Sequence, residues 1–254
     1  MNRTTKMLNI EMARISKNEL LERLDSGVLV TPNVDHMVTL QKDREFYDIY
    51  HKAEWVVCDS RILYLCSKLT KDRITEAIPG SSFFTAYYQY HKDDPDCRIF
   101  LLGAAEGVAE TAMRHINASV SRQIIVGAHS PSFGFEKRQD ECEEIYRIIN
   151  RSGANVVLVG VGAPKQEKWI FRHKDSMPGV KLWMALGATI DFEAGNIKRA
   201  PAIYRKLAIE WFYRIFQEPR RMMRRYFGRD LVFFIHFLRQ LTGTYKDPFR
   251  QQQQ

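Results

Sequence analysis

Apolar and polar positions alternate in blocks through the first 195 residues of the chain. The clearest apolar block, residues 156–161, is rich in β-branched residues and has no polar alternation, which is typical of a strand buried on both faces of a parallel sheet. Strands are predicted at residues 28–30, 55–58, 99–102, 123–126, 156–161 and 181–185. Helices are predicted at residues 15–26, 35–50, 62–68, 83–91, 136–151 and 166–173. This alternation predicts an α/β fold with a Rossmann-like parallel sheet core flanked by helices.

The segment after the strand at 156–161 carries the strongest sign of a ligand site. Gly160, Gly162 and Pro164 break the pattern, and Lys165, Gln166 and Glu167 then begin a helix. Glycines allow a backbone to approach a ligand closely, and the N–H groups at a helix start favour anions. In open α/β sheets, ligands bind beyond the carboxyl ends of the strands. The segment is therefore either a floor for a phosphate-containing ligand or only a tight turn with a solvated helix start.

Two other strand ends carry candidate chemistry. Thr31 and Asn33 follow the strand at 28–30, and Asp59 follows the strand at 55–58, so these side chains are expected at one cleft. An aspartate that begins a helix can also be a simple cap. Gly103 opens a G-x-x-x-G turn after another strand, which is a weak dinucleotide signal by itself.

Composition limits the class of protein. A chain of 254 residues is long enough for one large or two small domains. Its composition, 45% apolar and 27% charged, is that of an ordinary globular protein. The four cysteines have no C-x-x-C spacing, so neither a zinc site nor a disulfide framework is expected. No apolar stretch approaches the roughly 20 residues of a membrane span, and residues 1–10 lack a signal-peptide core. A cytoplasmic location is the default expectation.

Charge divides the chain into two parts. Residues 196–254 contain 13 basic and four acidic residues, whereas the whole chain has a net charge of +8. We therefore predict a domain at residues 1–195 and a basic helical appendage at residues 196–254. Aromatic residues and arginines alternate in the appendage, which suits an anionic membrane surface. A helix docked on the domain, or a homo-oligomer contact, is the alternative.

Several motifs together resemble one enzyme family. They are Thr-Pro-Asn-Val-Asp-His at residues 31–36, Asp59, residues 103–108, Val-Gly-Ala-Pro-Lys-Gln-Glu at residues 161–167, residues 191–195, residues 198–201 and residues 210–221. Their identity and order resemble the WecG/TagA/CpsF glycosyltransferases (family 26), and the first motif is most similar to exopolysaccharide members. The resemblance covers roughly residues 20–227.

The resemblance implies an inverting transferase on the inner face of the bacterial membrane. Such enzymes move a sugar from a UDP-sugar donor to a polyprenyl-diphosphate-linked saccharide, and the family is thought to need no metal and no other cofactor. The implied catalytic residues are Asp59, as general base, with Thr31 and Asn33. The implied donor-site residues are Gly103, Gly162, Pro164, Lys165, Gln166, Glu167 and Asp191. The implied acceptor and diphosphate residues are Arg199, Arg214, Arg220, Arg221 and Arg224.

These roles agree with the chemistry of the reaction. Inversion needs a base for the acceptor hydroxyl, and the leaving diphosphate needs fixed positive charge, which the planar guanidinium of arginine supplies well. The chain departs from the family pattern at Ala77 and Ser82, where an arginine and an acidic residue are common. Arg61 or Arg73 could compensate for that arginine.

Two other hypotheses compete with a transferase. One is an inactive relative that binds a nucleotide sugar or serves as a scaffold in a polysaccharide complex. The other is a nucleic-acid binder, which the sequence pI of about 9.3 alone suggests, without any recognition motif. We therefore expect no nucleic-acid partner.

Overall fold

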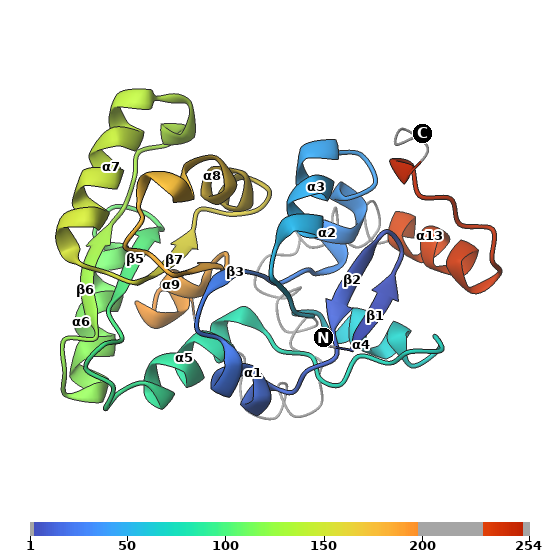
Figure 1. Ribbon diagram of the computed structural model, residues 1–254, viewed down its shortest axis with the longest axis horizontal. Helices are drawn as coiled ribbons and strands as arrows, with labels where there is room; N and C mark the ends of the chain where they lie inside the picture. Colours follow the sequence, from blue (N-terminus) through green and yellow to red (C-terminus); the bar gives the residue numbers. More distant parts are fainter. Residues whose placement is uncertain (1–2, 198–230, 251–254) are drawn as a thin grey trace.

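The computed structural model describes residues 3–197 and 231–250, and its centre is a six-stranded parallel sheet. The strand order is β4-β3-β8-β7-β5-β6, with helices on both faces (Figure 1). The strands are β3 (Gly27–Val30), β4 (Trp55–Val56), β5 (Ile99–Gly103), β6 (Ile125–His129), β7 (Val156–Gly160) and β8 (Leu182–Ala185). The predicted α/β class and parallel sheet are confirmed.

Helices cover both faces of the sheet and bury two separate apolar clusters. The helices are α1 (Lys17–Arg23), α2 (Val34–Thr39), α3 (Arg44–Lys52), α4 (Arg61–Ser67), α5 (Gly80–Tyr90), α6 (Val108–Val120), α7 (Gln139–Ser152), α8 (Lys165–His173), α9 (Thr189–Glu193) and α13 (Leu231–Leu241), with short 3-10 turns at Phe135–Lys137 and Lys174–Ser176. On β5, Phe100 and Leu102 join one cluster while Ile99 and Leu101 join the other. Because successive side chains of a strand point to opposite faces, a strand covered on both sides has no polar positions.

Two local features differ from the sequence prediction. The helix expected at 35–50 is two helices, because the Asp43 side chain accepts a hydrogen bond from the Phe46 N–H and starts α3 as a new helix. Residues before 15 form an antiparallel hairpin of β1 (Thr4–Met7) and β2 (Ile10–Ala13), which the sequence pattern did not predict. Each strand has only four residues, so its alternation of buried and exposed positions is too short to be recognised as a strand pattern in the sequence.

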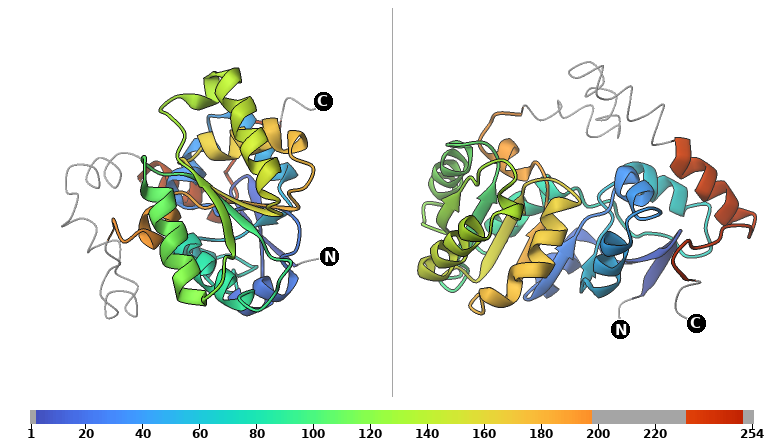
Figure 2. Two further views of the ribbon diagram at one scale, coloured as in Figure 1. Left: turned by 90° about the vertical axis from the view of Figure 1, so that its left-hand side faces the viewer. Right: turned by 90° about the horizontal axis from the view of Figure 1, so that it is seen from above.

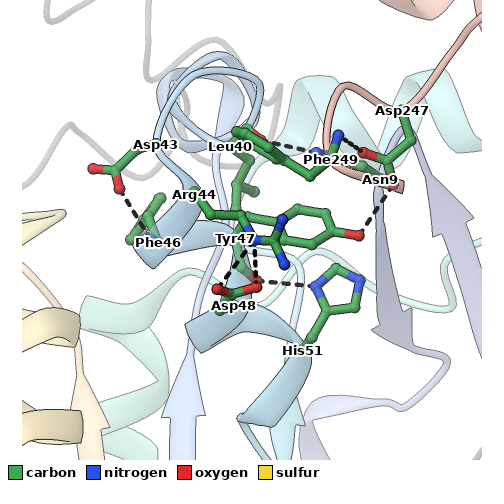
Figure 3. Close-up of polar contacts among 10 residues, drawn as sticks. All are labelled: Asn9, Leu40, Asp43, Arg44, Phe46, Tyr47, Asp48, His51, Asp247 and Phe249. Atoms are coloured by element: carbon green, nitrogen blue, oxygen red, sulfur yellow. Dashed lines mark hydrogen bonds and ion pairs between the residues drawn. The ribbon is translucent and has the colours of Figure 1, made fainter. Parts of the chain in front are cut away.

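The C-terminal segment 231–250 packs against the N-terminal hairpin and α2–α3. The Tyr47 hydroxyl donates to Asp247 over 3.1 Å, and the ring of Phe249 lies 5.1 Å from the Tyr47 ring (Figure 3). The Tyr245 hydroxyl donates to Gln41 over 2.6 Å. The described end of the predicted appendage is therefore fixed to the body, while the division at residue 195 stays a prediction.

None of the helices in the described residues has both the length and the apolar character needed to cross a bilayer. The most apolar of them, α13, has 11 residues, which corresponds to about 17 Å of helix against the roughly 30 Å of a hydrocarbon core.

Candidate active site

The sheet topology brings the predicted catalytic segments together. Strands β3 and β4 are parallel neighbours, so their carboxyl ends lie at one edge of the sheet. Beyond these ends, the Asp59 N–H donates to the Pro32 carbonyl over 3.2 Å. Thr31, which is 7% exposed, and half-buried Asp59 therefore stand side by side, as the sequence predicts.

The orientation of the Asp59 carboxyl group is set by Gly80 at the start of α5. The Gly80 N–H donates to Asp59 Oδ1 over 2.9 Å. A Cβ atom at Gly80 would lie 3.1 Å from the Leu186 side chain and 3.6 Å from Thr31 Oγ1. There is thus little room for a side chain at residue 80, a position that the sequence pattern did not single out.

Gln166 holds two neighbouring strand ends together. Its Oε1 accepts the N–H of Gly162, after β7, over 3.1 Å and the N–H of Gly187, after β8, over 3.2 Å. Its Nε2 donates to Glu167 Oε1 over 2.9 Å. Because Gln166 is only 2% exposed, its observed contribution is to brace the two turns. Direct contact of Gln166 with a donor stays a prediction.

Glycines allow the strand ends of β5, β7 and β8 to approach closely. A Cβ atom at Gly103 would lie 2.5 Å from the Gly160 carbonyl oxygen, and one at Gly160 would lie 2.6 Å from the Gly187 oxygen. Gly162 has φ +87°, a conformation that favours glycine. The edge between these strands is therefore built from closely approaching backbone with few side chains, which lets a phosphate-containing ligand approach the partly exposed turns at Gly162 and Gly187.

The two halves of the candidate site lie on the same sheet edge. Strands β3 and β8 separate β4, which leads to Asp59, from β7, which leads to Gly162. With strands about 4.8 Å apart, the two ends are on the order of 14 Å apart. An extended nucleotide-sugar molecule can bridge such a distance.

A buried acidic group lies beneath the edge. Glu167 is fully buried, and burial raises the pKa of its carboxyl to about 7. Its Oε2 has no hydrogen-bond partner among the described residues. Burial, together with the charges of Glu167 and Asp59, raises the pKa of the Tyr50 hydroxyl well above its usual value. That hydroxyl lies 2.9 Å from His36 Nδ1. The site therefore rests on a buried polar layer.

The rim of the site includes one residue that the sequence analysis did not select. Phe133, in the loop after β6, is 96% exposed, and Lys165 Nζ lies 5.4 Å from the centre of its ring. An exposed aromatic face beside a lysine suits a nucleobase next to a phosphate. Pro164 precedes α8, which starts at Lys165, and half-buried Asp191 lies on α9, where burial raises its carboxyl pKa.

The remaining predicted residues have other positions or lie outside the described part. Asn33 caps α2 by accepting the His36 N–H over 3.1 Å, so this structural role stands beside its predicted catalytic role. The Arg61 guanidinium lies 4.6 Å from the centre of the Tyr64 ring, and the Ser82 hydroxyl donates to the Pro79 carbonyl. The predicted diphosphate residues Arg199, Arg214, Arg220, Arg221 and Arg224 lie outside the described residues.

Within residues 3–197 and 231–250, no three His, Cys, Asp or Glu side chains are grouped so that they could hold a metal ion. The expectation of a reaction without a metal stays a prediction.

Comparisons with known proteins identify the family to which the chain is similar. The model of the glycosyl transferase WecG/TagA/CpsF family matches residues 5–247. A curated relative from Bacillus subtilis (strain 168), N-acetylglucosaminyldiphosphoundecaprenol N-acetyl-beta-D-mannosaminyltransferase, is 28% identical over 198 residues. That alignment covers 78% of the chain and 74% of the relative.

Proposed function

The chain belongs to the WecG/TagA/CpsF family of glycosyltransferases, and from this we propose which sugar transfer it catalyses. The proposed reaction moves a sugar from a UDP-sugar to a polyprenyl-diphosphate-linked saccharide during synthesis of a bacterial surface polymer or exopolysaccharide. The name of the Bacillus relative makes N-acetylmannosamine the first donor sugar to test and undecaprenyl-diphosphate-linked N-acetylglucosamine the first acceptor. The observation that carries the proposal is the position of Asp59 beside Thr31, on the sheet edge that also presents the Gly162 turn.

Asp59 is the proposed general base. The acceptor hydroxyl oxygen attacks the anomeric carbon of the donor, and the bond from that carbon to the diphosphate oxygen breaks. The diphosphate leaves with the bonding electron pair, while the hydroxyl proton passes to the Asp59 carboxylate. The Gly80 N–H, 2.9 Å from Asp59 Oδ1, supports this role because it fixes the direction of the carboxylate before the acceptor arrives.

The donor is proposed to lie across the ends of β5, β7 and β8. Backbone N–H groups of the turn after β7, other than the Gly162 N–H that Gln166 already accepts, and the Lys165 ammonium would face its diphosphate. Phe133 would face its base. As the family resemblance implies, we propose that arginines of the basic appendage complete this site and that no metal is needed.

A position on the inner face of the cell membrane is part of the proposal. A polyprenyl chain keeps its sugar acceptor at the bilayer surface, so the enzyme has to reach that surface. The excess of basic residues in 196–254 supports attraction to anionic lipid.

Transfer assays with Asp59→Asn test the proposal. Product formation is measured by mass spectrometry with a short-chain lipid-diphosphate N-acetylglucosamine acceptor and a panel of UDP-sugars. Asparagine keeps an oxygen that can accept the Gly80 N–H but cannot take the proton, so kcat should fall by about 10² to 10⁴-fold with little change in donor KM.

The matched control is Asp140→Asn, which changes an exposed aspartate in the first turn of α7 and should leave kcat unchanged. A wild-type rate in Asp59→Asn would remove Asp59 from the base role. Failure of the wild-type chain to transfer any sugar of the panel would contradict the proposed substrates.

A further inference from the structure

Large apolar side chains are exposed mainly at one end of the molecule. Among the described residues, nine large apolar side chains are exposed, and seven of them belong to α4, the turn after it, or α13. These two elements lie at the same end of the molecule in Figure 1 and in the right-hand view of Figure 2. On α13, Phe233 and Phe237 are buried in the core, so the exposed residues form a second apolar face of that helix.

The outer face of α4 combines apolar and basic side chains. Leu65 is 48% exposed and Leu69, in the turn after the helix, is 68% exposed. Arg61 and Lys68 are exposed at helical spacing from these leucines. Both cations also lie over the Tyr64 ring, Arg61 at 4.6 Å and Lys68 Nζ at 5.0 Å from its centre. The face is therefore a ridge of leucines flanked by positive charge.

The charge on this segment is mostly of one sign. Residues 61–73 contain four basic residues and one acidic residue. That acidic residue, Asp72, is paired with Arg14, which directly follows β2, at 3.2 Å. A surface that presents leucines and uncompensated positive charge is complementary to an anionic lipid bilayer, where basic residues contribute about 1 kcal/mol each.

The position of α4 connects this surface to the chemistry. The helix follows Asp59 directly, with Ser60 as its cap, and its seven residues span about 10 Å. A bilayer contact along the outer face of α4, which begins two residues after Asp59, would hold the Asp59 carboxylate close to that surface. An acceptor sugar joined through a diphosphate to a membrane-embedded chain has to be presented close to the same surface.

We propose that the outer face of α4, made by Arg61, Leu65, Lys68, Leu69 and Lys71, is a bilayer-docking surface that sets the height of Asp59 above anionic lipid. This inference rests on the proposed lipid-linked acceptor and adds a contact that lies outside the basic appendage. The face holds the enzyme at the membrane surface, and α4 transmits that position directly to the base.

The first experiment separates docking from chemistry. Binding of the wild-type chain and of the Leu65→Ser/Leu69→Ser variant to phosphatidylglycerol-containing vesicles is measured by sedimentation. Sugar transfer by both proteins is then assayed with two acceptors: a long-chain lipid-linked acceptor embedded in vesicles and a short-chain, soluble acceptor. Vesicle binding should fall on the order of tenfold, and transfer to the embedded acceptor should fall in parallel. Transfer to the soluble acceptor should not change. Tyr90→Ser, which changes an exposed residue at the end of α5, is the apolar control and should behave as wild type.

The second experiment tests the charge. Lys68→Gln with Lys71→Gln should weaken binding to phosphatidylglycerol-containing vesicles by roughly 30-fold and leave the weaker binding to phosphatidylcholine vesicles unchanged. Lys92→Gln with Lys181→Gln removes the same charge from other exposed positions and should have a much smaller effect.

Three results would overturn the inference. One is that both α4 variants bind anionic vesicles, and transfer sugar to the embedded acceptor, as well as the wild type does. Another is failure of the wild-type chain to bind anionic vesicles at all. The third is a change of oligomeric state in Leu65→Ser/Leu69→Ser, measured by light scattering, without a change in vesicle binding, which would make the face a contact between copies. If the wild type transferred sugar to neither acceptor, the proposed function would be contradicted instead. The docking inference would still be tested, because vesicle binding is measured independently of activity.

Discussion

The buried carboxyl group of Glu167 gives a sharp test of the site architecture. Glu167 lies at the start of α8, is fully buried, and accepts a hydrogen bond from Gln166 over 2.9 Å. Burial raises the pKa of this carboxyl from its usual 4.5 to about 7, because the charged form loses its hydration. The variant Glu167→Gln keeps the size of the side chain and the acceptor for Gln166 but cannot ionise.

The magnitude follows from the two pKa values. Below pH 4.5 the carboxyl is protonated in both the folded and the unfolded chain, so its ionisation has no effect on stability. Between pH 4.5 and about 7, only the unfolded chain releases the proton, and stability falls by about 1.4 kcal/mol per pH unit. The total loss is about 3 kcal/mol and is complete above about pH 7. Glu167→Gln removes this loss.

The assay is urea-induced unfolding of wild type and Glu167→Gln at a series of pH values from about 4.5 to 8. The free energy of unfolding of the variant minus that of the wild type should rise by about 3 kcal/mol across this series. The same comparison for Glu22→Gln, an exposed glutamate of α1, should show no such rise. Parallel pH profiles for wild type and Glu167→Gln would refute the burial of an ionisable group beneath the sheet edge.

Three further predictions concern stability, each measured by urea unfolding. Lys168→Met breaks the ion pairs between α8 and α3, with Asp43 at 2.6 Å and Glu45 at 3.1 Å. The free energy of unfolding should fall by about 1 kcal/mol at low salt and by less at high salt, and an equal fall at both would contradict an electrostatic origin. Phe233→Ala empties a fully buried position between α13 and the body and should cost about 3 to 5 kcal/mol, so a cost below about 1 kcal/mol would count against this docking. Gly103→Ala places a Cβ atom 2.5 Å from a carbonyl oxygen of β7 at φ +136° and should destabilise the chain strongly; wild-type stability would show that the strand ends can separate.

Some parts of the site follow from the sequence because they depend only on local pattern. The apolar run before Gly160 and the polar triplet from Lys165 place a strand end next to a helix start without any knowledge of neighbours. The same reasoning places Thr31 and Asp59 at strand ends, and parallel strands present their ends at one edge. The existence of a polar sheet edge, and the residues closest to it, were therefore predictable.

Other parts depend on partners far away in the sequence. The Gln166 amide bridges Gly162 and Gly187, and this requires β7 and β8 to be neighbours, which strand patterns alone do not specify. Gly80 contacts Asp59 from 21 positions away, and its sequence context is that of an ordinary turn. In the sequence, Phe133 is one aromatic residue among many, and only the fold places it beside Lys165.

By itself, the sequence determined the class of fold, the family and the sheet edge at which Thr31, Asp59 and the Gly162 turn lie, because burial and turn formation act over a few residues at a time. Only the tertiary structure decided the strand order, the break that makes Asp43 a new helix cap, the docking of residues 231–250 on the hairpin and the depth of Glu167. The reason is physical. Contacts between distant segments depend on which surfaces fit together once the core has formed, and no local pattern of apolar and polar residues contains that information.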